Sequence, residues 1–135
     1  MIIPAGNIYS GDPLRAVFTA PTEIAKWKGN LRQSYPVTVD GKTYRDAEAA
    51  YQHLARDCKA DTRLCYSICI MVTVCKLRQH PRIVQAIKDS GGAHWIESCS
   101  HWVGSRKKNP GRWEGDGQQS GFIRCLGLAY LEVVG

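Results

Sequence analysis

Two polar side chains, Glu48 and Gln52, lie four residues apart in a segment with the composition of a helix. This spacing places both on one helical face. A carboxylate stacked on an amide suits a polar site, in which the carboxylate serves as acid or base and the amide holds a ligand by hydrogen bonds. The alternative is a pair of solvated surface residues, since most Glu and Gln side chains are exposed.

The segment around this pair predicts a short hairpin followed by a helix. Residues 37–44 contain two short runs of strand-forming residues on either side of Asp40 and Gly41. An Asp-Gly pair suits the positive φ angles of a tight primed turn. Asp46 is a suitable N-cap for the helix that carries Glu48 and Gln52, and we expect that helix to run to about Arg56.

The most apolar segment of the chain, residues 64–77, is expected to be the central helix. Its β-branched residues favour a strand, but its length favours a helix buried in the centre of the domain. Lys76, near its end, is the exception. Its charge suits a helix C-terminus with the stem reaching solvent, and the alternative is a contact with a phosphate or a ribose.

The remaining segments predict a single domain of mainly α structure with a small β-hairpin element. Caps and apolar spacing predict further helices at residues 22–28, 81–91, 93–99 and 122–134, with a strand as the alternative for the last residues of the chain. Residues 1–30 are rich in Pro and Gly and suggest irregular structure with short strands. Residues 104–121 are rich in Gly and polar side chains and predict a long loop, which is often functional.

Composition narrows the classes of partner. The chain has 135 residues, of which 44% are hydrophobic and 22% charged, as in an ordinary globular domain. No apolar run reaches the roughly 18 residues of a membrane span, and the N-terminus does not resemble a signal peptide, so no membrane partner is expected. The net charge of +6 favours anionic partners. The densest basic cluster is Arg106-Lys107-Lys108 with Arg112. This loop either binds phosphate or nucleic acid, or it is ordinary solvated surface.

The six cysteines are not expected to form a disulfide framework. Cys65, Cys69 and Cys75 lie in the most apolar segment, where a free cysteine behaves as a small hydrophobe. The chain has no Cys-x-x-Cys pair, and its four histidines lack metal-ligand spacing. We therefore expect reduced thiols, a cytoplasmic location, and neither a metal nor another cofactor.

Several short motifs occur in a characteristic order. They are Gly29-Asn30-Leu31, the hairpin at 37–44, Glu48 with Gln52, Lys76-Leu77-Arg78-Gln79-His80-Pro81, Ser90-Gly91, Ile96-Glu97, Asn109-Pro110 with Trp113 and Gly115, and Leu126-Gly127 with Leu131. Together they resemble the NADAR superfamily of YbiA-like domains, over about residues 30–132. Departures are the missing Asp between residues 97 and 104, Ala55 near the place of a family Lys, and the inserted residues 116–123.

The resemblance implies a single YbiA-like domain that cleaves a bond between ribose C1 and a nitrogen. Its two substrate classes are ADP-ribose on a nucleic-acid base, chiefly guanine, and phosphoribosyl intermediates of riboflavin synthesis. Breaking this bond builds positive charge on the ribose ring. The resemblance implies Glu48 as the catalytic carboxylate. Its place in the first turn of a helix favours the ionised form, which suits a base or an electrostatic stabiliser better than an acid. Protonation of the leaving base then requires another group, for which Glu97, Asp116 and His101 are candidates.

The resemblance also implies a set of substrate-binding residues. Lys76 and Arg56 are expected to hold phosphates, and Asn30 and Gln52 ribose hydroxyls. Glu97 is placed in the same site. Trp102 and Trp113 are expected either to stack on a base or to pack in the core. Two other functions stay open: a non-catalytic module that binds an ADP-ribose-type nucleotide, motivated by the missing Asp, and a basic domain that binds DNA or RNA through residues 106–112.

Overall fold

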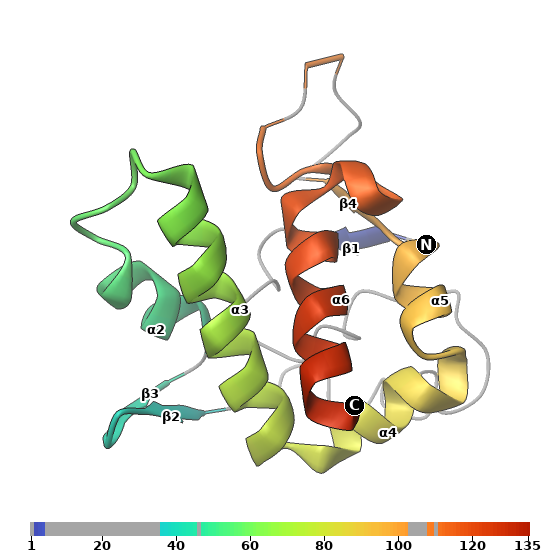
Figure 1. Ribbon diagram of the computed structural model, residues 1–135, viewed down its shortest axis with the longest axis horizontal. Helices are drawn as coiled ribbons and strands as arrows, with labels where there is room; N and C mark the ends of the chain where they lie inside the picture. The colour runs from blue at the N-terminus through green and yellow to red at the C-terminus, as the bar shows by residue number, and fades with distance from the viewer. Residues whose placement is uncertain (1, 5–35, 46, 103–107, 110) are drawn as a thin grey trace.

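The computed structural model describes residues 2–4, 36–45, 47–102, 108–109 and 111–135 (Figure 1). Helices dominate this part of the chain, which confirms the predicted mainly α class with a small β element. The elements in chain order are β1 (Ile2–Pro4), β2 (Val37–Val39), β3 (Lys42–Tyr44), α2 (Ala47–Leu54), α3 (Thr62–Gln79), α4 (Pro81–Ser90), α5 (Ala93–Glu97), β4 (Ser100–Trp102), β5 (Gly115–Asp116), the 3₁₀ helix η4 (Gly117–Gln119) and α6 (Gly121–Val134). The expected helix at 22–28 and the expected cap Asp46 lie outside the described residues.

The hairpin forms where the sequence predicts it. β2 and β3 pair antiparallel, with Val37 opposite Tyr44, and both side chains are buried. Asp40 and Gly41 form the turn with φ angles of 49° and 79°, the left-handed values of a primed turn. The helix that follows, α2, ends at Leu54, slightly earlier than expected.

A side-chain amide attaches the hairpin to the end of α3. Gln79 accepts a hydrogen bond from the backbone N–H of Thr38 and donates one to its carbonyl, each 2.8 Å long. The amide thus pairs with β2 as a neighbouring strand would. His80 adds a hydrogen bond of 2.7 Å between its Nε2 and the carbonyl oxygen of Pro36. Gln79 and His80 therefore have structural partners in the hairpin.

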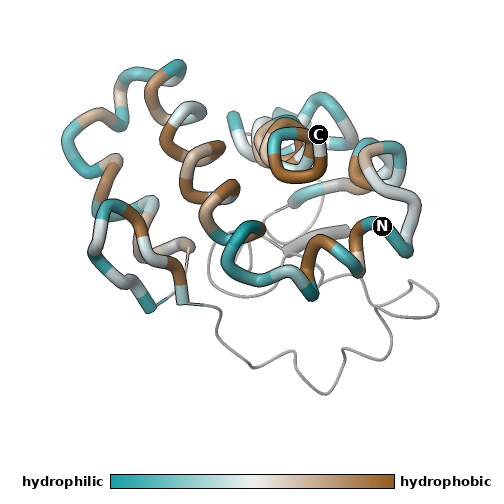
Figure 2. The backbone as a smooth tube through the Cα atoms, turned by 60° about the horizontal axis from the view of Figure 1, so that its bottom comes forward, coloured by the Kyte–Doolittle hydropathy of each residue, from teal (hydrophilic) through white to brown (hydrophobic). Residues whose placement is uncertain are grey.

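The centre of the domain is built by α3 and α6, which run parallel and side by side (Figure 1). Apolar segments recur along α3 in Figure 2, where α6 is seen nearly end-on. Their buried side chains include Cys65, Cys69 and Val72 from α3 and Phe122, Cys125, Leu126 and Ala129 from α6. α3 is central but not buried all round as expected, because Leu64 is 42% and Met71 39% exposed. The prediction took every apolar position as inward, whereas α3 turns one face to solvent.

The connecting helices follow the predicted boundaries closely. Pro81 occupies the first turn of α4, where its missing N–H costs nothing, and Gly91 ends the helix with a φ of 128°. The next helix, α5, stops at Glu97, two residues before the expected end. At the C-terminus of the chain α6 stays helical to Val134, so the alternative of a terminal strand is not realised.

The second sheet was not predicted as a unit. β4 lies at its centre, with β1 parallel on one side and β5 antiparallel on the other. β5 and η4 fall inside residues 104–121, so the part of this stretch that the structure describes is more ordered than the predicted loop. No described helix is long and apolar enough to cross a membrane. All six cysteines are free.

Candidate functional site

Helix α2 carries the two residues that first suggested a site. Glu48 is its second residue and Gln52 follows one turn later, as predicted. Ala47, Ala50 and Tyr51 face the core, whereas Gln52 is exposed. The side chain of Glu48 lies outside the described part of the structure. The backbone therefore places this pair beside Tyr51, at the margin of the buried face of α2.

Three aromatic side chains meet next to α2, and we call Tyr51, Tyr66 and Trp113 the aromatic cluster. Trp113 packs edge-on against both tyrosines, with ring centroids 5.7 Å from Tyr51 and 5.1 Å from Tyr66. This arrangement is favoured by the ring quadrupoles. Tyr51 is buried, whereas Tyr66 and Trp113 are half-buried. The cluster thus closes the core on one side and reaches the surface on the other.

Three cations border the aromatic cluster, and we call Lys59, Arg112 and Arg124 the cationic rim. Lys59 places its Nζ 5.2 Å from the ring centroid of Tyr51, and Arg124 its guanidinium carbon 5.5 Å from that of Tyr66. Both distances are within the range of cation–π attraction. Arg112 donates a hydrogen bond of 3.4 Å to the carbonyl oxygen of Lys59.

Hydrogen bonds connect the rim to two of the predicted site residues. Lys59 donates through Nζ to Oε1 of Gln52. On the other side, Arg124 donates to the hydroxyl of Tyr66 at 3.1 Å and to the carbonyl oxygen of Gln118 at 2.6 Å. Gln118 in turn donates a bond of 3.3 Å to the carboxylate of Glu97. Gln52, Trp113 and Glu97, which are distant in the sequence, therefore belong to one connected surface.

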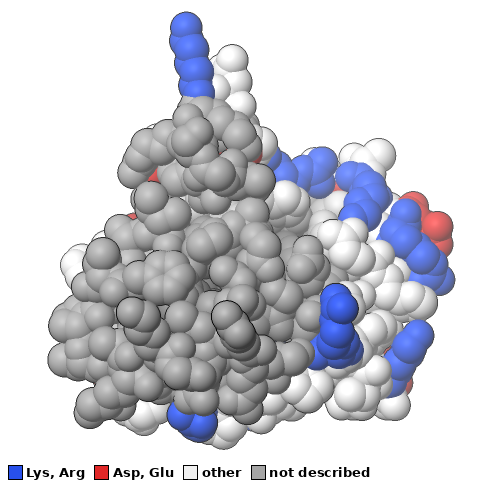
Figure 3. All heavy atoms as spheres, turned by 180° about the vertical axis from the view of Figure 1, so that it is seen from behind, with Lys and Arg blue, Asp and Glu red and all other residues white. Residues whose placement is uncertain are grey.

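The electrostatics of this surface favour an anionic ligand with an aromatic group. Burial raises the pKa of Tyr51, with Cys65 as a hydrogen-bond partner, so its ring stays neutral. Lys59 precedes α3 by a short turn, and Arg124 lies in the first turn of α6. The first turns of the two helices lie at the same end of the parallel pair (Figure 1), where the helix dipoles add positive potential. The side of the molecule that carries α2 and the hairpin, at the right of Figure 3, shows several Lys and Arg side chains and few acidic ones.

Lys76 does not join this surface. Its side chain is only 1% exposed, so the prediction that its stem reaches solvent is wrong. The reason is helical register, because Lys76 follows Val72 and Thr73 by one turn on the inward face of α3. It also lies ten residues beyond Tyr66, or about 15 Å along the helix axis.

The other predicted residues are exposed, buried in the core, or outside the described structure. Arg56 is exposed in the turn after α2, where it donates a 2.6 Å bond to the carbonyl oxygen of His53 and lies 3.6 Å from Asp57. His101 is completely buried with its ring 5.0 Å from that of Phe122, which places it in the core and not beside a leaving base. Asp116 is exposed at the end of β5. Asn30, the side chain of Trp102, and residues 105–107 lie outside the described structure.

Sequence reasoning missed four residues of this region. Lys59 and Arg124 are single cations without a motif, and Tyr66 is hidden among the apolar residues of the central helix. Only the rarity of a cation in the apolar C-terminal helix would have singled out Arg124. Glu114 is buried and accepts a 3.1 Å bond from the backbone N–H of Gly111, which holds the loop before Trp113.

Within the described residues, no group of three or more His, Cys, Asp or Glu side chains is placed to hold a metal ion. Comparison with known proteins does not assign the chain to a family. No protein-family model matches it, and searches of curated proteins and of solved structures gave no significant match. The resemblance to the NADAR superfamily therefore stays a prediction that rests on the ordered motifs of the sequence.

Proposed function

We propose that this protein is an N-glycosidase that hydrolyses the bond between ribose C1 and a nitrogen of its substrate. The substrate class is either ADP-ribose attached to a guanine base of a nucleic acid or a phosphoribosyl intermediate of riboflavin synthesis. Both contain the same reacting bond, a phosphorylated ribose and a heterocyclic base. The proposal rests on the resemblance to the NADAR superfamily together with the surface around α2.

The single observation that supports it most is the setting of Gln52. This residue lies one turn after Glu48 and accepts a hydrogen bond from Lys59, whose ammonium group also lies over Tyr51. A substrate at this place would have cations for its phosphates and aromatic rings for its base. A carboxylate on the same helix face would stabilise the positive charge that develops on ribose.

The proposed roles follow from the position of each group. Glu48, in the first turn of α2, acts as an ionised carboxylate that stabilises the ribose cation or activates water. Arg112 binds a phosphate, and Trp113 contributes an aromatic edge or face to the base. Glu97, which is exposed and hydrogen-bonded to Gln118, is the best described candidate for protonating the leaving base.

Product analysis with two substrates tests the proposal. One is a DNA oligonucleotide with ADP-ribose on guanine, and the other a phosphoribosylated aminopyrimidine. Mass spectrometry is expected to find free ADP-ribose and the unmodified oligonucleotide from the first, or ribose phosphate and the free pyrimidine base from the second. Boiled protein and Glu48→Gln protein serve as controls. If the native protein releases neither product while the folded state is verified by circular dichroism, hydrolase function is refuted for these substrates.

A second candidate is a module that binds the same ligands without cleaving them. The observation that favours it is the composition of the described surface, in which cations and aromatic rings outnumber the carboxylates that acid–base chemistry requires. Calorimetry with ADP-ribose separates the two functions. Binding without turnover of either substrate would favour the module, and turnover would exclude it.

A further inference from the structure

The large apolar side chains that are exposed in the described structure all lie on α3 or α6. They are Leu64, Met71, Leu128, Leu131 and Val134, with between 38% and 55% of each residue exposed. Single apolar residues scattered over a surface need no explanation, but a set confined to one pair of adjacent helices marks an interaction surface.

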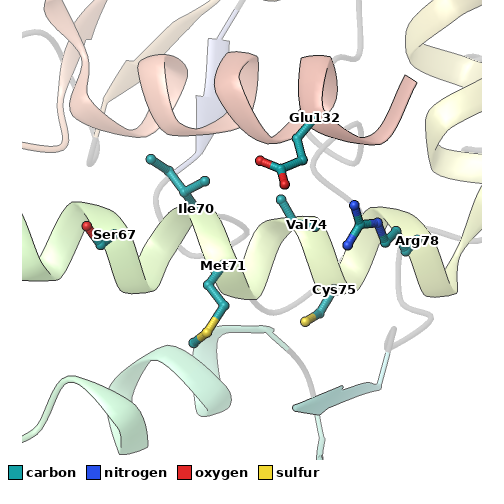
Figure 4. A pocket seen from close by; sticks show the side chains of 7 residues that line it. All are labelled: Ser67, Ile70, Met71, Val74, Cys75, Arg78 and Glu132. Carbon is teal, nitrogen blue, oxygen red and sulfur yellow. The ribbon is translucent and has the colours of Figure 1, made fainter. Parts of the chain in front are cut away.

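A groove with a volume of about 420 Å³ lies on this helix pair (Figure 4). It is lined by Ser67, Ile70, Met71, Val74, Cys75 and Arg78 from α3 and by Glu132 from α6. The α3 residues recur with helical spacing, so they form one stripe about three turns long. Leu128, more than half exposed, precedes Glu132 by one turn on the same face of α6. We call the groove together with Leu128 and Leu131 the apolar face.

Opposite charges border the apolar face on its two helices. Arg78 ends the α3 stripe and Glu132 stands on α6, and both are exposed. Figure 4 shows both side chains at the same end of the groove. Neither forms an ion pair within 4.0 Å with another described residue. An acidic partner would place a negative charge against Glu132, and a basic partner would place a positive charge against Arg78. A surface with one charge of each sign is complementary to a copy of itself.

We propose that the apolar face binds a second copy of this chain in a two-fold symmetric dimer. In this dimer Arg78 of each copy faces Glu132 of the other, and the exposed side chains of Met71, Leu128 and Leu131 are buried between them. A two-fold interface uses the same patch on both copies, so each cross-pair occurs twice. The interface lies along the flank of α3, whereas the aromatic cluster lies at its N-terminal end, so dimerisation is compatible with the proposed function but independent of it.

Sedimentation velocity with charge-exchange variants tests the dimer. Wild-type chain is expected to shift from monomer to twice the monomer mass between about 1 and 100 μM. Arg78→Glu and Glu132→Arg, each alone, should raise the dissociation constant on the order of a hundredfold, because each change creates two like-charge contacts. An equimolar mixture of the two variants should restore the dimer, since both cross-pairs then have opposite charges. Lys88→Glu, an exposed change on α4, should leave the dissociation constant unchanged.

Cysteine labelling locates the interface independently. Cys75 is half-buried in the groove, and Cys58, also half-buried, lies in the turn before α3. Alkylation of Cys75 by iodoacetamide, followed by peptide mass spectrometry, should slow as the protein concentration rises, whereas alkylation of Cys58 should not.

Three results would overturn the proposal. The first is a wild-type chain that remains monomeric up to about 100 μM, in which case another partner covers the apolar face. The second is a dimer whose dissociation constant is unaffected by either charge variant. The third is a mixture of the two variants that stays as monomeric as each variant alone.

Discussion

The role of Gln52 depends on partners that the fold brings to it. Its spacing from Glu48 is visible in the sequence, but its hydrogen-bond partner Lys59, and Trp113 on the adjacent Tyr51, reach this place only through the fold. The turn after α2 brings Lys59 back over Tyr51, and the loop before α6 brings Trp113 to the same ring. The chemistry of a single side chain here depends on groups up to about sixty residues away.

Glu48→Gln should separate transition-state stabilisation from binding. The substitution keeps the shape of the side chain and removes its charge, so the fold and substrate affinity should persist. Loss of charge stabilisation should lower kcat on the order of a hundredfold, with little change in KM. Steady-state kinetics measures both constants. Asp89→Asn, on the exposed face of α4, is the matched control and should retain full activity. Full activity of Glu48→Gln would transfer the carboxylate role to Glu97 or Asp116.

Arg112→Gln should weaken the binding of a phosphorylated ligand. A charge-assisted hydrogen bond to phosphate contributes about 1.5 to 3 kcal/mol, so the dissociation constant for ADP-ribose should rise roughly tenfold or more. The loss of one cation should also reduce the dependence of affinity on salt. Calorimetry at two salt concentrations measures both effects, with Lys88→Gln as a charge-matched control far from the cluster. Equal affinities for Arg112→Gln and the control would show that Arg112 does not contact the ligand.

The N-terminal caps of α3 and α6 differ in how deeply their side chains are buried. Ser120 caps α6 by accepting a 3.1 Å bond from the N–H of Ile123, and it donates a 2.6 Å bond to the carbonyl oxygen of Trp113. Its side chain is completely buried. Asp61 caps α3 with one 3.1 Å bond from the N–H of Leu64, and it is exposed. Ser120 therefore fixes both a helix start and the loop that presents Trp113.

Ser120→Ala should accordingly destabilise the protein more than Asp61→Ala. Loss of a helix cap costs about 1 kcal/mol, and the carbonyl oxygen of Trp113 would lose a buried partner at a cost of a further 1 kcal/mol or more. Urea denaturation of the two variants and wild type provides the comparison. Ligand affinity should fall only in Ser120→Ala, because only this change releases Trp113. Equal free energies of unfolding for the two variants would mean that the bond to Trp113 adds no stability.

The elements that the sequence predicts well are those with local determinants. Asp40-Gly41 specifies its turn, and Pro81 and Gly91 mark both ends of α4. The strand β4 has no such determinant, because it is three residues long and pairs with β1, whose residue Ile2 lies opposite Ser100. The inward position of Lys76 was missed for a different reason, since composition does not reveal which face of an almost uniformly apolar helix meets the core. The same limit applies to the exposed Leu64 and Met71.

At the scale of the whole molecule, the parallel pair of α3 and α6 produces two separate surfaces. Their N-terminal ends support the aromatic cluster and the cationic rim, while the groove lined by both helices belongs to the apolar face. One helix pair thus provides a core, a candidate ligand site and a candidate interface. Because the two surfaces contain different residues, variants can test each without altering the other.

Global stability should decrease in alkaline solution, and Cys99 provides the clearest reason. Burial raises the pKa of its thiol to about 11 from an ordinary value of 9.0, and burial raises the pKa of Cys75 as well. In the unfolded chain Cys99 ionises near its ordinary value, so the unfolded state loses its proton first. The stabilising contribution is complete below about pH 9 and is lost as the pH rises through about 11.

The expected loss from Cys99 alone is about 2 to 3 kcal/mol in the free energy of unfolding. Urea denaturation between about pH 8 and pH 11, in the presence of a reductant, measures it. Cys99→Ala should be less stable at neutral pH because the side chain fills a fully buried position, yet it should lose less stability over the alkaline range. Parallel curves for wild type and Cys99→Ala would contradict the assignment and leave the remaining buried groups, such as Tyr51, as the source of any alkaline loss.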